Sequence, residues 1–283
     1  MKKWIISAKT SRTVGKVCSY ILLIFFACIF FMPFLWMLST AVKPTNQIFL
    51  NPPKWIPDPI KWENFATIFK RMPLFAYTKN TLVVAILPVL GQIFAAPMIA
   101  YSLTKIPWKG AKYIFPLILA TMMIPWQVTQ IPLFITWSKL GLVNTFVPLV
   151  LPEFFGTPYY IYLMRQFVKG LPDSVIEAAR IDGANELQIF TRIMFPLGSS
   201  VTVTLTIFSF MWRWNDYILP LLVLSDQKKY TIQIAIKNFI GNLGVDWSSI
   251  LAASVLSILP VIVIFIFLQK YIIGGISASG VKG

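Results

Sequence analysis

The chain contains no histidine and only two cysteines. Without histidine it lacks the usual general base of enzymes and the commonest metal ligand. Cys18 and Cys28 fall in one predicted helix, about 15 Å apart along its axis, which is too far for a disulfide. We therefore expect no metal site, no disulfide framework and no thiol chemistry.

Charged residues are also scarce, and most of them are basic. Only 12% of the 283 residues are charged while 57% are hydrophobic, and 25 Lys and Arg against 10 Asp and Glu give a net charge of +15. Such a composition is too apolar for a soluble fold of this size. The basic residues lie at the ends of apolar runs and not in one stripe with aromatic residues between them. This favours an integral membrane protein in a lipid bilayer, with no nucleic acid as partner.

Long apolar runs predict an all-α, polytopic fold with six transmembrane helices, since about 20 apolar residues cross a bilayer. The third run carries Pro116, Pro125 and Pro132, which should kink or break it. The first run is too long for a cleaved signal peptide, the alternative interpretation, and lacks a clear cleavage site. The predicted spans are about 17–38, 81–103, 113–137, 146–164, 197–224 and 248–268.

The orientation is predicted from the basic residues of short loops. Residues 1–16 hold five basic residues and no acid, and the turn 105–112 holds three lysines, so both are expected in the cytoplasm. The segment 43–79 is rich in proline and tryptophan and is expected on the outer interface, although it carries six basic residues. With six spans, the tail 271–283 is cytoplasmic as well, and the permeation domain covers 17–270.

The segment 165–196 is the most polar stretch of its length between two apolar runs. Pro172 and Asp173 are typical of a helix start and Gly183 of a helix end, which predicts a helix over 172–182. Asn185 is expected to cap a second helix, with Gln188 bonding back to it. The apolar side of that second helix should hold Leu187, Phe190, Ile193 and Met194.

Two interpretations of this loop stay open from its residues alone. The first helix has small residues at Ala178 and Ala179 and apolar ones at Ile176 and Ile181. Such a surface suits docking in the groove of a partner protein. An amphipathic loop lying on the lipid headgroups would also have this composition.

Polar groups recur late in the fifth span and once in the fourth. Aromatic faces beside amide and carboxylate groups are what a sugar needs, because its ring faces are apolar and its hydroxyls need hydrogen bonds. The alternative is an aromatic belt with a structural pair between Arg213 and Asp216, one turn apart. Glu153 is either functional, as intramembrane carboxylates usually are, or reached by interfacial water. The candidates for a solute path are Trp212, Trp214, Asn215, Asp216, Tyr217 and Glu153.

The spacing Glu177-Ala178-Ala179, Gly183, Ile193 and Phe195-Pro196 resembles the cytoplasmic "EAA" loop of permease subunits of ATP-binding-cassette importers, although Phe195 stands where leucine is usual. The Trp-Asn-Asp stretch of span five and the tail from Ser279 to Gly283 resemble carbohydrate-importer permeases of the MalG-like branch, with Ser279 where alanine is common. This resemblance implies a type I importer fold with a cytoplasmic coupling helix. It assigns ATPase coupling to Glu177, Ala178, Ala179, Asp182 and Gly183.

The resemblance also implies the partners. These are a homologous second permease, an ATPase dimer, an extracellular solute-binding protein and a saccharide of the oligosaccharide class, all at the bacterial cytoplasmic (inner) membrane. Residues 275–282 mimic a phosphate-binding loop, but the lysine is one place late and no Ser or Thr follows. ATP and Mg are thus expected on the ATPase subunits, with no cofactor in this chain, which is not an enzyme. The alternative function is a stand-alone secondary transporter, for which Glu153 and Asp216 give thin support.

Overall fold

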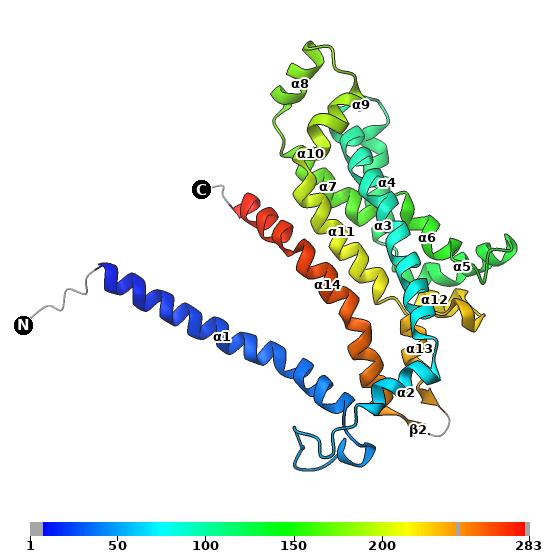
Figure 1. Ribbon diagram of the computed structural model, residues 1–283. Coiled ribbons are helices and arrows are strands. Elements are labelled where there is room, and N and C mark those ends of the chain that lie inside the picture. The colour runs from blue at the N-terminus through cyan, green and yellow to red at the C-terminus, as the bar shows by residue number, and fades with distance from the viewer. Residues whose placement is uncertain (1–7, 242–243, 281–283) are drawn as a thin grey trace, which may run out of the picture. The chain divides into compact units, whose positions relative to one another are not determined.

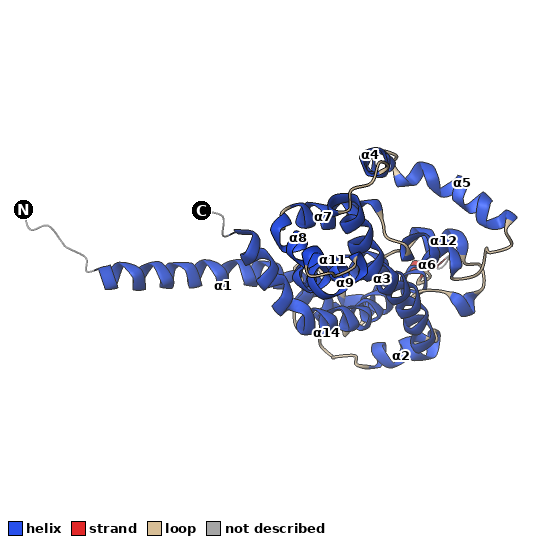
Figure 2. Cartoon of the chain, turned by 90° about the horizontal axis from the view of Figure 1, so that it is seen from above, coloured by secondary structure: helices blue, strands red, loops and turns tan. Residues whose placement is uncertain are grey.

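A computed structural model describes residues 8–241 and 244–280 of the protein. Helices make up most of the described chain, with loops between them (Figure 2), which confirms the all-α expectation. Two short strands, β1 (Ile240–Gly241) and β2 (Gly244–Val245), pair antiparallel. The beginning of the predicted N-terminal tail (1–7) and the end of the predicted C-terminal tail (281–283) lie outside the described residues.

The chain forms two compact units. The first comprises Met1–Met72 and Phe239–Leu256, and the second Pro73–Asn238 and Ser257–Gly283. The first contains α1 (Ala8–Ala41), η1 (Thr45–Gln47), α2 (Glu63–Arg71) and the start of α14 (Trp247–Gly280). The second unit contains the remainder of α14 and all the other helices. Its first half holds α3 (Leu74–Lys105), α4 (Ala111–Met122), α5 (Trp126–Lys139), α6 (Val147–Phe154), α7 (Pro158–Lys169) and α8 (Asp173–Ile181). Its second half holds α9 (Glu186–Ile189), the π-helical turn η2 (Phe190–Met194), α10 (Phe195–Leu197), α11 (Ser199–Trp214), α12 (Ile218–Val223), η3 (Gln227–Lys229) and α13 (Ile232–Lys237).

Three helices of the described chain are long and apolar enough to cross a membrane by themselves. They are Thr13–Ala41 within α1, Leu74–Lys105, which is α3, and Trp247–Gln269 within α14. Two further pairs pass the same test together, with bends of 99° between α4 and α5 and 74° between the helix ending at Leu197 and α11. The structure therefore supports a multi-pass protein with three to five such spans, and the count of six stays a prediction.

Several predicted spans are not continuous helices. The segment 146–164 divides into α6 and α7, because Gly156 takes a left-handed backbone with φ +93 and Pro158 begins a new helix. The fifth predicted span is interrupted at Gly198 and again at residues 215–217. Of the three prolines expected to disturb the third span, Pro125 lies at the break, whereas Pro116 and Pro132 remain inside α4 and α5.

Three helices extend well beyond their predicted ends. Helix α1 begins at Ala8, inside the segment predicted as N-terminal tail, and α3 begins at Leu74, inside the segment predicted as external loop. Helix α14 continues to Gly280, inside the segment predicted as C-terminal tail. Spans are predicted from their apolar core alone, whereas a helix can continue past that core; α14 does so through Gly274 and Gly275, against their low helix propensity.

The first unit has its own buried contacts. Lys43, just after α1, is fully buried, with its ammonium 3.6 Å from the centre of the Trp36 ring. Burial lowers the pKa of Lys43 below its ordinary value. The carbonyl of Lys43 accepts hydrogen bonds from Asn64 and Ser248, and Arg71 of α2 pairs with Asp246. These contacts join the end of α1, α2 and the start of α14.

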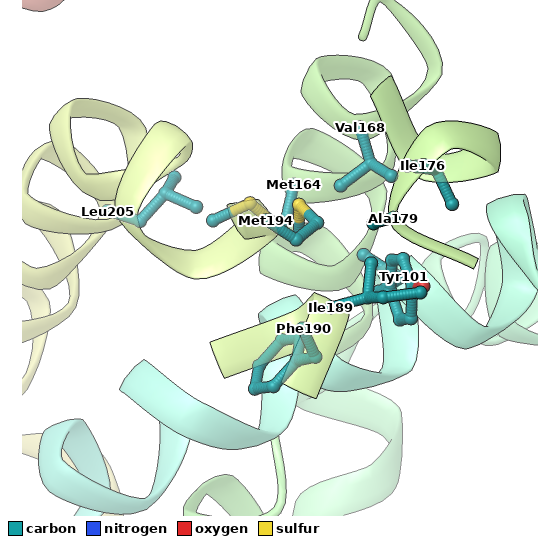
Figure 3. Close-up of a cluster of buried hydrophobic side chains, with 10 residues drawn as sticks. Tyr101, Met164, Val168, Ile176, Ala179, Ile189, Phe190, Met194 and Leu205 are labelled. Atoms are coloured by element: carbon teal, nitrogen blue, oxygen red, sulfur yellow. The ribbon is translucent and has the colours of Figure 1, made fainter. Parts of the chain in front are cut away.

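In the second unit, α3 packs along α6, α7 and α11, and these helices lie side by side (Figure 1). A buried apolar cluster lies where α3, α7 and α11 meet α8, α9 and η2 (Figure 3). Its members are Ala100, Tyr101, Met164, Val168, Ile176, Ala179, Ile189, Phe190, Met194 and Leu205. We call it the loop cluster, because it packs the helices of the polar loop 165–196 against α3 and α11.

Candidate functional site

The polar loop folds as a helix, a sharp turn and a second helix. Helix α8 begins at Asp173 after the extended residue Pro172, and it has Arg180 in its last turn, which suits the helix dipole. Gly183 follows with φ +82. The observed helix is one residue shorter at each end than the predicted 172–182, and the left-handed glycine is confirmed.

The second helix starts with the predicted capping box. The side chain of Asn185 accepts from the amide of Gln188 at 2.9 Å, and the side chain of Gln188 accepts from the amide of Asn185 at 2.9 Å. Phe190 and Met194 are buried as expected, but Leu187 is 66% exposed. The π-helical turn from Phe190 to Met194 widens the helix, so a spacing of 3.6 residues does not hold across it.

Helix α8 has two different faces. Ile176 and Ala179 point into the loop cluster beside Met164 and Val168 of α7 (Figure 3). The other residues predicted for coupling, Glu177, Ala178, Asp182 and Gly183, are exposed. Ala179 thus packs α8 against the loop cluster, while the other four residues lie on the surface.

Apolar residues adjoin these four on the surface. Ile181 is 85% exposed and Leu187 66%, and Val175 is exposed as well. None of the three was among the predicted coupling residues. Since one turn of helix separates Ile181 from Glu177, the exposed face combines charge with large apolar side chains. We call it the α8 face, consisting of Val175, Glu177, Ala178, Ile181, Asp182, Gly183 and Leu187.

Polar contacts across the Gly183 turn were not predicted. Arg180 donates from Nε to Glu186 Oε1 at 2.8 Å, and Tyr101 of α3 donates its hydroxyl to Glu186 Oε2 at 2.6 Å. The hydrogen bond to Glu186 raises the pKa of the Arg180 guanidinium, although partial burial acts in the opposite direction. Tyr101 and Glu186 lie 85 residues apart in the chain, so no local pattern in the sequence marks this contact.

The residues predicted for the solute path occupy three kinds of environment. Trp212 is 66% exposed, whereas Trp214 is 1% exposed and donates from its indole to the carbonyl of Ser257 at 3.1 Å. Asn215 is exposed and donates to the carbonyl of Met211, and Tyr217 packs against a buried cluster. Of these four, Trp212 and Asn215 are exposed, Tyr217 is partly buried and Trp214 is buried.

Both carboxylates among the path candidates contact Arg213. Its guanidinium donates to Asp216 at 3.0 Å, as expected for neighbours one turn apart, and also pairs with Glu153 from α6. All three side chains are at most 20% exposed. This ion cluster joins α6 to the end of α11, and the pairing of Glu153 with Arg213 was not predicted from the sequence.

A second polar group lies between α3, α7 and α11. Ser209 donates to Gln92 at 3.1 Å, and Gln92 donates to Thr157 at 3.4 Å, beside a small recess also lined by Tyr160 and Thr202. Hydrogen bonds of this kind hold helices together where water is absent. Over residues 8–241 and 244–280, no group of three or more His, Cys, Asp or Glu is arranged to hold a metal ion.

Comparison with known proteins finds relatives along nearly the whole chain. The arabinooligosaccharides transport system permease protein AraQ of Halalkalibacterium halodurans is 33% identical over 278 residues, covering 96% of this chain and 99% of AraQ. The melibiose/raffinose/stachyose import permease protein MelC of Bacillus subtilis is also 33% identical over 278 residues, covering 97% of this chain and all of MelC.

The fold has a close match among solved structures. A chain from the crystal structure of a bacterial ABC transporter involved in the import of the acidic polysaccharide alginate superimposes with a TM-score of 0.78 at 25% identity, covering 94% of this chain and 99% of that one. The family described as "Binding-protein-dependent transport system inner membrane component" matches residues 92–277, which include α8, the Gly183 turn and the ion cluster. The chain therefore belongs to this family of non-catalytic, multi-pass permease subunits of ATP-binding-cassette importers and has their type I fold.

Proposed function

We propose that this chain forms, with a homologous second permease, the path by which an ATP-driven importer takes up a saccharide of the oligosaccharide class. The observation that carries this proposal is the full-length similarity to AraQ and MelC, whose names state transport of arabinooligosaccharides and of melibiose, raffinose and stachyose. The likeness to the alginate importer supports a saccharide as well. The family favours this function over a stand-alone secondary transporter.

Energy comes from separate ATPase subunits that bind ATP and Mg, and this chain carries no cofactor of its own. The ATPase dimer docks on the α8 face, where Glu177, Ala178, Asp182 and Gly183 are exposed, while Ala179 holds the helix on the loop cluster. The mixture of charged and large apolar exposed residues suits either a protein partner or the lipid headgroups, and the match to the importer family favours the protein partner. An extracellular solute-binding protein delivers the saccharide, in keeping with the family's description.

The protein lies in the cytoplasmic membrane of a bacterium, with both termini and the loop 165–196 in the cytoplasm and residues 43–79 outside. The family's description as an inner membrane component supports the location. The basic turn 105–112 begins at the last residue of α3, and that residue contacts α8, so both cytoplasmic segments belong to the same end of the second unit. The domain plan remains a permease domain over 17–270 with two short tails.

The solute path includes Trp212 and Asn215, whose exposed rings and amide suit a sugar. Behind them lie Glu153 and Asp216, which pair with Arg213, the buried Trp214 and the partly buried Tyr217. An aromatic belt with a structural ion cluster would use the same residues without contacting solute. Uptake by Trp212→Ala and Asn215→Ala variants distinguishes the two.

The proposal is tested by purifying the tagged chain from its own host. It should bring with it a second permease and two ATPase subunits, and the isolated chain should not hydrolyse ATP. Appreciable ATP hydrolysis by the isolated chain would overturn the assignment of energy to separate subunits.

A further inference from the structure

One residue of α3 contacts both ends of α8. Lys105, the last residue of α3, donates from Nζ to the carbonyl of Leu171 at 2.8 Å and to Asp173 Oδ1 at 2.6 Å, at the start of α8. Its own carbonyl accepts from Arg180 Nη2 at 2.9 Å, in the last turn of α8. The short helix is thus tied at its beginning and at its end to one point of α3.

A second set of hydrogen bonds links Arg180, across the Gly183 turn, to Glu186. Glu186 at the start of α9 accepts from Arg180 at 2.8 Å and from the hydroxyl of Tyr101 at 2.6 Å. Tyr101 lies four residues before Lys105, on the same side of α3 one turn away. The last turn of α3 therefore contacts the first helix, the turn and the second helix of the loop.

Among these contacts, those of Lys105 are the ones best shielded from water, whereas the side chains of Arg180 and Glu186 are 34% and 41% exposed. The Lys105 side chain is 6% exposed, although its partner Asp173 is 75% exposed. Hydrogen bonds made by charged groups exceed neutral ones, and those shielded from water are less screened. Beside them the ring of Tyr101 packs in the loop cluster with Ile176, Ala179 and Ile189 (Figure 3). These hydrogen bonds and the apolar packing together hold α8, α9 and the end of α3 in a fixed arrangement.

We propose that Lys105, Tyr101, Arg180 and Glu186 form a clamp that passes movement between α8 and α3. The inference rests on the proposed function, in which the ATPase subunits move α8. None of the four residues needs to contact ATP or solute, so they are positioning residues of the coupling mechanism. Because α3 packs along α6, α7 and α11, a displacement of its end moves the helices of the second unit with it.

The test uses the complete importer, with its second permease, ATPase subunits and binding protein, reconstituted in liposomes. Lys105→Met removes the ammonium and keeps most of the side-chain volume. Lys109→Met is the matched control, because it removes a lysine from the same cytoplasmic turn at a residue outside the clamp. The measured quantity is solute transported per ATP hydrolysed, together with the amount of ATPase that stays bound.

We expect Lys105→Met to lower solute transported per ATP at least threefold with the ATPase still bound, and Lys109→Met to match the wild type. Tyr101→Phe removes a single oxygen and should also lower the ratio, which decides the matter if Lys105→Met fails to assemble. A wild-type ratio in assembled Lys105→Met, or in Tyr101→Phe where the former does not assemble, would overturn the clamp. Failure of the proposed function would be seen separately, as wild-type uptake that does not need ATP.

Discussion

At the scale of single residues, position 183 favours glycine because of its backbone conformation and not because a side chain would lack space. Its φ is +82, and a Cβ there would meet nothing within 4 Å. The left-handed region costs a residue with a side chain about 1 kcal/mol or more, and a β-branched residue is the least favourable there. Asparagine tolerates the left-handed region better than other residues with side chains.

We therefore expect Gly183→Val to tilt α8 and lower solute transported per ATP, while Gly183→Asn stays close to the wild type. Transport and ATPase activity measured in the same liposomes test this, with retention of the ATPase as a check on assembly. Equal coupling in the two variants would mean that the turn's conformation does not matter.

Two tryptophans in one predicted set should behave in opposite ways. Trp214 is 1% exposed and donates to Ser257, so Trp214→Ala should lower the free energy of unfolding by about 3–5 kcal/mol. Trp212 is 66% exposed, and Trp212→Ala should change stability by no more than about 0.5 kcal/mol while reducing uptake. Thermal unfolding in detergent and uptake in liposomes measure both effects. A stable Trp214→Ala, or a Trp212→Ala with normal uptake, would contradict these assignments.

At the scale of secondary-structure elements, α8 combines a packing face with an exposed face. Ile176 is 4% exposed in the loop cluster, and Ile181 is 85% exposed on the α8 face. Ile176→Ala should destabilise the chain by about 2–5 kcal/mol. Ile181→Ser should leave stability within about 0.5 kcal/mol and weaken ATPase binding. Thermal unfolding and the amount of copurified ATPase test the pair, and undiminished ATPase binding by Ile181→Ser would remove Ile181 from the docking surface.

The ion cluster of Arg213, Glu153 and Asp216 links α6 to the end of α11. Arg213→Met leaves the carboxylates of Glu153 and Asp216 without their partner, and we expect a loss of about 3–5 kcal/mol in stability. Adding Glu153→Gln and Asp216→Asn should restore part of the loss, because the uncompensated charges are then gone. Melting temperatures of the single and triple variants measure this. A triple variant no more stable than Arg213→Met alone would argue against a structural cluster.

Local features of the loop could be predicted from the sequence, and contacts between distant segments could not. Proline, aspartate, glycine and the pair Asn185–Gln188 define α8, its end and the next helix within a few residues of each other. Lys105 and Asp173 lie 68 residues apart, and Arg213 and Glu153 lie 60 apart. Such partners depend on how helices pack, which helix periodicity and capping signals do not specify.

At the scale of the whole molecule, composition was enough to predict a membrane protein, the long apolar runs were enough to predict an all-α fold, and the motifs were enough to predict the family. Span boundaries were less predictable, because an apolar window does not distinguish a continuous helix from two helices divided at Gly156 or Gly198. The start of α3 at Leu74 was missed for another reason, because the helix begins before its apolar core and passes through Lys79 and Asn80. Hydropathy reports where the chain prefers lipid, while glycine and proline decide where a helix stops.

The measurement that tests the central claim most directly is uptake of a labelled oligosaccharide by liposomes holding the complete importer and the binding protein. We predict uptake only with Mg and ATP on the side where the ATPase subunits lie, and none when this permease or the ATPase is omitted. Uptake that continues without ATP, driven by an ion gradient across the liposome membrane, would contradict the assignment and support a secondary transporter.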